Sequence, residues 1–97
     1  MPKAYWIACY REVSDSAKLA AYARLAAPAI EAGGGRFLAR ATAAHAYEAG
    51  QRERTVVIEF QSVEHATATH DSPEYQAALA ALADGAIRDL RIVPGVT

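Results

Sequence analysis

Strand-like and helix-like patterns alternate along this chain in an order that few folds accommodate. Three short runs are rich in aromatic and β-branched residues, a fourth strand-like run contains many small residues, and two further runs carry apolar residues at every third or fourth position. The first four runs predict strands, and the two further runs predict amphipathic helices with one buried face. The resulting order, β-α-β-β-α-β, predicts an α+β fold in which helices cover one face of a single antiparallel sheet.

The predicted strands begin with residues 4–12, an aromatic-rich run for which both faces are expected to be largely covered. A second strand is expected over residues 36–48. A third is expected over residues 54–60, where RTVVIEF gives the strongest strand signal in the chain. These two strands form a hairpin whose turn begins at Gly50, and the run DLRIV, residues 89–93, predicts the last strand.

The first helix is expected to begin at a cap, either Ser14 or Asp15, and to end at the glycine run 33–35. Pro28 lies inside this helix. A proline there removes one backbone donor and disfavours helical geometry at the preceding residue, which predicts a kink or a restarted turn.

The stretch THDSPEYQAALAAL places a histidine, an aspartate and a serine side by side. A catalytic triad needs its members to converge in space, whereas neighbours in an extended segment point in different directions. Ser72 instead suits the N-cap of the second main helix, because Pro73 follows at the first helical position and Glu74 lies in the first turn. A shorter helical segment is expected to begin at Ser62.

Alanine supplies much of the apolar composition. The chain has 24 alanines but only 17 valine, isoleucine and leucine residues, which is little material for the core of a single domain over residues 1–97. A small domain with a thin core favours further burial against another copy, so a homodimer is expected. Cys9 has no cysteine partner and is expected to be a buried small hydrophobe.

The charge pattern argues against several classes of partner. Net charge is −1 with acids and bases interspersed, so no nucleic-acid footprint is predicted. The first residues, MPKAYWIACYRE, lack a run long and apolar enough for a signal peptide or a membrane span. No membrane partner and a cytoplasmic location are therefore expected.

The three histidines do not suggest a metal site. His65 and His70 are five residues apart, which on a helix separates them by roughly 140°, and His45 lies alone on the hairpin. No metal and no bound cofactor are expected. His70 precedes a helix start, where side chains often face a cleft, so it is a candidate acid or base in a pocket.

Strand alternation nominates a charged pair. In VVIEF, Glu59 faces away from the side that carries Ile58, and in RFLAR, Arg40 shares a face with Leu38. Folding of the hairpin would make Arg40 and Glu59 diagonal neighbours on the face without helices. That pair is either a bland surface contact or, under a second sheet, an enclosed charged pair that marks a pocket.

Four segments carry a resemblance to a known family. KAYWIA, GGRFLAR, VVIEF and SPEYQ occur in order over almost the whole chain, which is similar to the bacterial family called domain of unknown function 1330. The resemblance implies a ferredoxin-like protomer of the dimeric α+β barrel superfamily, in which two sheets enclose a cavity. It implies no single activity, because the superfamily includes cofactor-free monooxygenases, isomerases and members without known chemistry.

These observations predict a homodimer with a small-molecule pocket between the sheet and the partner chain. Its candidate residues are Arg40, Glu59, His70, Tyr10 and Trp6, although alternation leaves open which face of the first strand lines the pocket. Arg40 would hold an anion, and Glu59 or His70 would move a proton. The alternatives are a cofactor-free enzyme of monooxygenase or isomerase type, and a non-catalytic interaction module.

Overall fold

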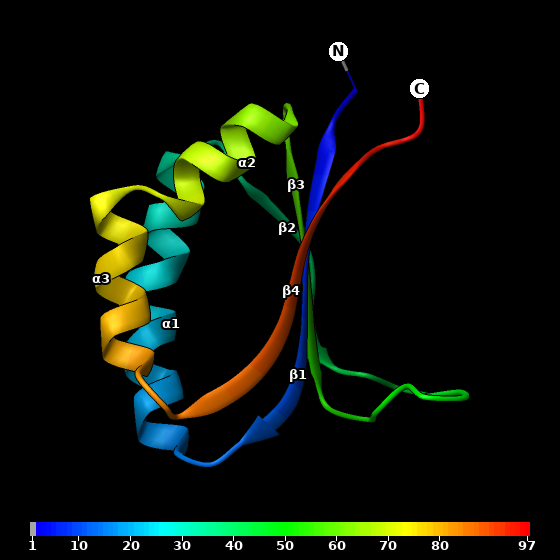
Figure 1. Cartoon of the computed structure of the whole chain (residues 1–97), viewed down its shortest axis with the longest axis vertical. Helices are drawn as coiled ribbons and strands as arrows, with labels where there is room; N and C mark the ends of the chain where they lie inside the picture. The colour runs from blue at the N-terminus through cyan, green and yellow to red at the C-terminus, as the bar shows by residue number, and fades with distance from the viewer. Residues whose placement is uncertain (1) are drawn as a thin grey trace.

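The computed structural model describes residues 2–97 and confirms the predicted α+β fold (Figure 1). A short additional helix, which the segment from Ser62 predicts, lies before the last one. The elements are β1 (Ala4–Val13), α1 (Ser16–Ala32), β2 (Arg36–Thr42), β3 (Arg54–Phe60), α2 (Val63–His70), α3 (Pro73–Leu82) and β4 (Ala86–Pro94).

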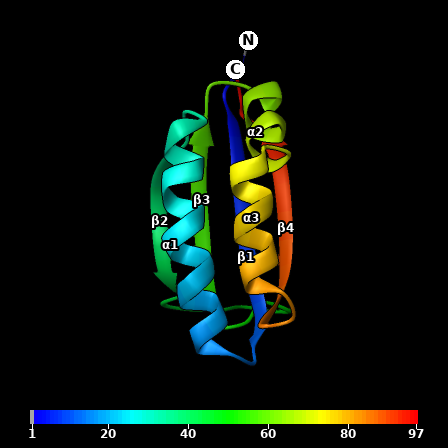
Figure 2. The ribbon, with the colours of Figure 1, turned by 90° about the vertical axis from the view of Figure 1, so that its left-hand side faces the viewer.

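The four strands form one sheet in the order β2-β3-β1-β4, and every neighbouring pair is antiparallel. All three helices lie on one face, so that the molecule has two layers (Figure 1). Figure 2 shows α1 over β2 and β3, and α3 over β1 and β4. This is the ferredoxin-like arrangement.

None of the helices over residues 2–97 is long and apolar enough to cross a membrane.

Alternate residues of the two central strands build the core between the layers. On β1, Trp6 and Tyr10 face the helices, and on β3, Ile58 and Phe60 do so; each is at most 4% exposed. The Trp6 ring meets the edge of Tyr75 from α3 at 4.9 Å between ring centroids. Because large aromatic side chains bury the most apolar area, this cluster is the main source of hydrophobic stabilisation.

The other face of the sheet is not covered within the chain. Along β1, Tyr5 and Ile7 are only partly buried, and Cys9 is exposed. The expectation that Cys9 is a buried hydrophobe is therefore wrong, because it alternates with the buried Ala8 and Tyr10 and so points away from the helices. Within one copy of the chain only one face of β1 is covered, where both were expected to be.

The first helix begins where its capping residue predicts. The Asp15 carboxylate accepts hydrogen bonds from the backbone N–H groups of Ala17 and Lys18, both at 3.0 Å. The helix is continuous through Pro28, without the restarted turn that was one of the two outcomes expected there, and it ends at Ala32 with Gly33 as its C-cap. Gly34 then takes a positive φ of 88°, a conformation that glycine adopts at little cost.

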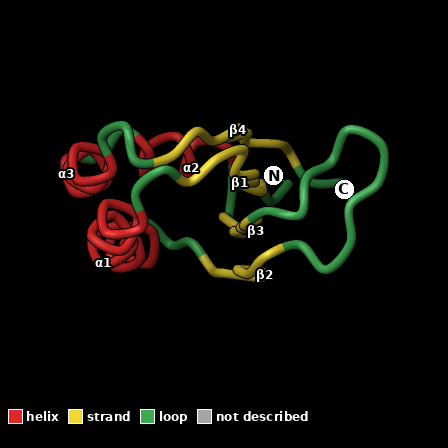
Figure 3. The backbone as a smooth tube through the Cα atoms, turned by 90° about the horizontal axis from the view of Figure 1, so that it is seen from below, coloured by secondary structure: helices red, strands yellow, loops and turns green. Residues whose placement is uncertain are grey.

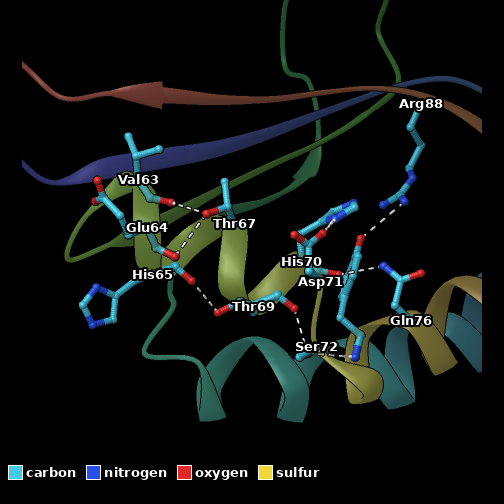
Figure 4. Close-up of polar contacts among 11 residues, drawn as sticks. Val63, Glu64, His65, Thr67, Thr69, His70, Asp71, Ser72, Gln76 and Arg88 are labelled. Carbon is cyan, nitrogen blue, oxygen red and sulfur yellow. Dashed lines mark hydrogen bonds and ion pairs between the residues drawn. The ribbon is translucent and has the colours of Figure 1, made fainter.

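The stretch that resembles a triad is a helix start. Ser72 Oγ accepts a hydrogen bond from the Tyr75 backbone N–H at 3.2 Å and donates one to the Thr69 carbonyl at 2.7 Å (Figure 4). His70 Nδ1 lies 3.0 Å from a carboxylate oxygen of Asp71, a residue that is exposed. Ser72 is therefore occupied in joining α2 to α3, as the N-cap interpretation predicts.

The second strand is shorter than predicted. It ends at Thr42, and residues 43–53 form a loop that extends from the face of the sheet opposite to the helices (Figure 3). Tyr47 in this loop is 79% exposed. Alanine-rich residues after Thr42 lack the β-branched side chains that favour a strand, which accounts for its early end.

A candidate ligand pocket under the first helix

A β-bulge in β2 decides where Arg40 points. Phe37 pairs with Ile58, but Ala39 rather than Leu38 pairs with Val57. The extra residue shifts the alternation by one position, so Arg40 comes opposite Val56 on the face that the helices cover. The prediction that Arg40 shares the uncovered face with Glu59 is therefore wrong.

Glu59 lies on the uncovered face, as predicted, but with other partners. It pairs across the sheet with Arg36 and Tyr5 in register. Its carboxylate accepts hydrogen bonds from the Tyr5 hydroxyl at 3.2 Å and from Lys3 Nζ at 3.4 Å. With 18% of its side chain exposed, Glu59 belongs to a partly shielded polar cluster that is separate from Arg40.

A hollow with a volume of about 40 Å³ lies between α1 and the sheet. Its walls are apolar side chains from both layers. They include Ala23, Ala26 and Ala27 of α1, and Trp6, Val56 and Ile58 of the sheet. Alanine side chains are small, so this part of α1 fills less of the space above the sheet than larger apolar residues would. The enclosed part has room for roughly three water molecules.

Three arginines, Arg40, Arg54 and Arg88, line the pocket. Tyr10 pairs with Arg88 across β1 and β4, and the β1–β3 register brings Arg54 to the other side of Tyr10. The guanidinium carbons of Arg54 and Arg88 lie 5.9 Å and 5.7 Å from the centre of the Tyr10 ring. Arg40 is exposed at the outer end, with its guanidinium 4.3 Å from the centre of the Phe37 ring.

Arg88 is held by two tyrosines from different helices. It donates hydrogen bonds to the Tyr22 hydroxyl at 3.0 Å and the Tyr75 hydroxyl at 3.4 Å, and the two hydroxyls are 2.8 Å apart. Figure 4 shows Arg88 reaching from its strand toward the helices. Burial raises the pKa of Tyr22 well above its ordinary range, so its phenol is neutral at physiological pH.

The charge of Arg88 is secure in this setting. Burial alone would lower its pKa, but the oxygens of Tyr22 and Tyr75 outweigh burial and raise the pKa above its already high value. The guanidinium is therefore a cation at physiological pH. Its two hydrogen bonds fix its position at the edge of the pocket.

The pocket carries positive charge without an acidic partner. Its lining contains no aspartate or glutamate, and over residues 2–97 none of Arg40, Arg54 and Arg88 forms an ion pair. Arg54 Nε is buried and has no hydrogen-bond partner in the same part of the chain. A buried donor without a partner costs free energy, so this site is suited to a bound acceptor.

The predicted site residues divide between the two faces and the core. Arg40, Tyr10 and Trp6 line the pocket, whereas Glu59 lies on the opposite face. The His70 ring is 5.7 Å from the Trp6 ring but does not line this pocket; it borders a shallow depression beside β4. The structure thus brings together three of the five candidates.

The interpretation of the sequence missed Arg54, Arg88 and Tyr22. The sequence did contain a signal for the two arginines. Strand alternation places Arg54 on the same face of β3 as the core residues Val56 and Ile58. It places Arg88 on the same face of β4 as the partly buried residues Leu90 and Ile92. A charged residue on the buried face of a strand is a reason to expect a site.

Over residues 2–97, no three His, Cys, Asp or Glu side chains gather to hold a metal ion.

Comparisons with solved structures support this fold. A protein of unknown function from Rhodopseudomonas palustris is similar with a TM-score of 0.76 and 15% identity, over 99% of this chain and 84% of that one. A dimeric ferredoxin-like protein of unknown function from Thermobifida fusca is similar with a TM-score of 0.61 and 22% identity, over 97% and 92%.

A third similar structure is a proposed antibiotic biosynthesis monooxygenase from Caulobacter crescentus, with a TM-score of 0.64 and 15% identity, over 99% of this chain and 92% of that one. No curated protein matches the chain. At these identities the structures establish the fold alone. The model of the family "Domain of unknown function (DUF1330)" matches residues 3–96, and the chain therefore belongs to that family.

Proposed function

We propose that this protein binds a compact organic molecule in the pocket between α1 and the sheet. The observation that carries the proposal is the hollow itself, whose lining combines apolar side chains with three arginines. Most ligand sites combine a mainly apolar lining with a few polar groups that orient the ligand. The ligand site proposed here is on the helix-covered face, in contrast to the expected cavity between sheet and partner.

Binding is a better match to the lining than catalysis. The pocket residues include no carboxylate, imidazole or thiol that could take a proton from a substrate. Tyr22 has a raised pKa and is suited to donate a hydrogen bond rather than to act as a base. A monooxygenase-like or isomerase-like reaction would need its proton acceptor from the substrate itself, so enzyme activity is the second candidate.

The protein is further proposed to be a homodimer. The uncovered face of the sheet presents Leu38 and Val93, which are 45% and 41% exposed, beside the partly buried Ile7 and Val57. A second copy would cover these side chains, and the Thermobifida fusca relative is described as dimeric. Because the pocket is on the other face, such a dimer leaves it free to bind a ligand.

The pocket can be tested by filling it. Ala26 is 3% exposed and lines the hollow, so Ala26→Leu should occupy the space, whereas Ala20→Leu on the exposed side of the same helix should not. A set of compact organic fragments, both neutral and charged, would be screened by ligand-observed NMR. At least one fragment is expected to bind wild type and Ala20→Leu but not Ala26→Leu.

The same experiment can overturn the proposal. If no fragment distinguishes Ala26→Leu from Ala20→Leu, the hollow is not a binding site. Because extra methylene groups in a packed region cost about 1 to 3 kcal/mol, thermal denaturation of both variants would verify that each is folded.

A further inference from the structure

We propose that the ligand is an organic monocarboxylate and that Arg54 and Arg40 hold its carboxylate. This inference rests on the proposed function, since it names the class of molecule that the same pocket takes. Three guanidinium groups converge on one pocket whose lining contains no acid. Such a cluster repels itself unless an anion compensates it.

Free donors identify which arginines contact the anion. Arg88 already gives hydrogen bonds to Tyr22 and Tyr75, so it contributes mainly its charge. Within residues 2–97, Arg54 has a buried Nε without a partner, and the contact recorded for the Arg40 guanidinium is stacking on the Phe37 ring. Arg40 lies opposite Val56, the residue two positions after Arg54, so the two side chains are near neighbours on the same face.

The geometry favours a carboxylate over a phosphate. A guanidinium presents two parallel N–H groups that match the two oxygens of a carboxylate. Phosphate sites commonly add the backbone N–H groups of a helix N-terminus, but α1 faces this pocket with side chains between Tyr22 and Ile30, which lie beyond the first turn of the helix. The pocket therefore lacks the additional donors that a dianion would need.

The rest of the pocket lining favours a ligand whose remaining part is apolar. Beyond the arginines the ligand would meet Trp6, Ile58 and Ala26, which bind hydrocarbon and not water. The enclosed volume of about 40 Å³ admits only a few atoms, so the rest of the molecule must lie outside it. A short aliphatic or single-ring carboxylate meets both conditions, and butyrate and benzoate are suitable probes.

The test compares each acid with its neutral amide. Trp6 is the only tryptophan and lines the pocket, so its fluorescence and isothermal calorimetry can both report binding. We expect benzoate or butyrate to bind and benzamide and butyramide to bind at least tenfold more weakly. Arg54→Met should weaken binding of the acid roughly 10- to 100-fold and leave the amide unchanged.

Two further variants make the result specific. Arg24→Met removes an equal charge from the exposed side of α1 and should leave acid binding unchanged. Arg54→Lys keeps the positive charge but loses the planar guanidinium with its two parallel N–H donors. Binding of the acid should therefore fall less in Arg54→Lys than in Arg54→Met. This variant also decides the question if Arg54→Met does not fold.

Distinct outcomes separate this inference from the proposed function. Equal binding of acid and amide, tighter binding of inorganic phosphate than of either acid, or an equal loss in Arg24→Met would overturn the carboxylate assignment and leave the pocket intact. The carboxylate assignment would also be overturned if some fragments bind wild type but not Ala26→Leu, while neither benzoate nor butyrate binds. Loss of all Ala26-dependent binding would overturn the proposed function as well.

Discussion

Tyr22 and Arg88 join the first helix to the last strand through a hydrogen bond of 3.0 Å at the edge of the pocket. Tyr22 is 7% exposed, and its hydroxyl also lies 2.8 Å from that of Tyr75. One phenol therefore positions a cation and connects two helices. This arrangement makes Tyr22 important to stability as well as to the shape of the site.

Removal of the Tyr22 hydroxyl should destabilise the fold. Tyr22→Phe deletes an acceptor for Arg88 and leaves a buried donor without its partner, which should cost about 1 to 3 kcal/mol in the free energy of unfolding. Urea denaturation measures this loss. Tyr47→Phe is the matched control, because that side chain is 79% exposed and should change stability little. An equal effect of the two variants would contradict the assigned role.

The raised pKa of Tyr22 predicts a dependence of stability on alkaline pH. Folded Tyr22 retains its proton at a pH at which the unfolded chain, with a pKa of about 10, has lost it. The contribution of Tyr22 to the free energy of unfolding is therefore complete below a pH of about 10. It declines as pH rises from there toward the higher pKa of the folded state. The stability difference between wild type and Tyr22→Phe should therefore narrow above a pH of about 10.

Denaturation over a series of alkaline pH values tests this expectation, with tyrosinate absorbance as an independent measure of ionisation. Comparison of wild type with Tyr22→Phe removes the pH-dependent contributions that the two proteins share. A stability difference that is constant with pH would show that the Tyr22 pKa is the same in the folded and unfolded states.

Local chemistry made much of this fold predictable. Ser72 and Pro73 predict a helix start because the cap and the proline each fix their own backbone geometry. The alternation in residues 54–60 predicts the buried face of β3, since a regular strand has a strict period of two. These features depend on neighbouring residues, and the structure confirms them.

The pocket depends on a feature that local chemistry does not mark. The bulge at Leu38 occurs on β2, an edge strand, where one extra residue disrupts few ladder hydrogen bonds. Nothing in RFLAR distinguishes a bulged strand from a regular one, so alternation assigned Arg40 to the wrong face. The convergence of Arg54 and Arg88 around Tyr10 also depends on strand pairing between distant parts of the chain.

The proposed dimer predicts a result for the uncovered face. Val57→Glu places a carboxylate on that face in each copy, and burial of two unpaired like charges at a symmetric interface opposes association. Light scattering should give the mass of two protomers for wild type and of one for this variant. Ala77→Glu, on the exposed side of α3, should remain dimeric. A wild-type protein that is folded and has the mass of one protomer at micromolar concentration would contradict the dimer.

The face assignment of Glu59 predicts which residues depend on it energetically. Tyr5 donates a hydrogen bond to Glu59 at 3.2 Å, whereas Arg40 lies on the other side of the sheet. A double-mutant cycle with Tyr5→Phe and Glu59→Gln should give a coupling energy of about 0.5 kcal/mol or more, since the carboxylate is only 18% exposed.

The control cycle pairs Arg40→Met with Glu59→Gln and should be additive within about 0.5 kcal/mol, because the sheet separates the two side chains. Urea denaturation of the single and double variants supplies both energies. Strong coupling in the Arg40 cycle would return Arg40 to the uncovered face, and the pocket under α1 would then lose the arginine at its outer end. Coupling confined to the Tyr5 cycle would support the bulged register on which the proposed site depends.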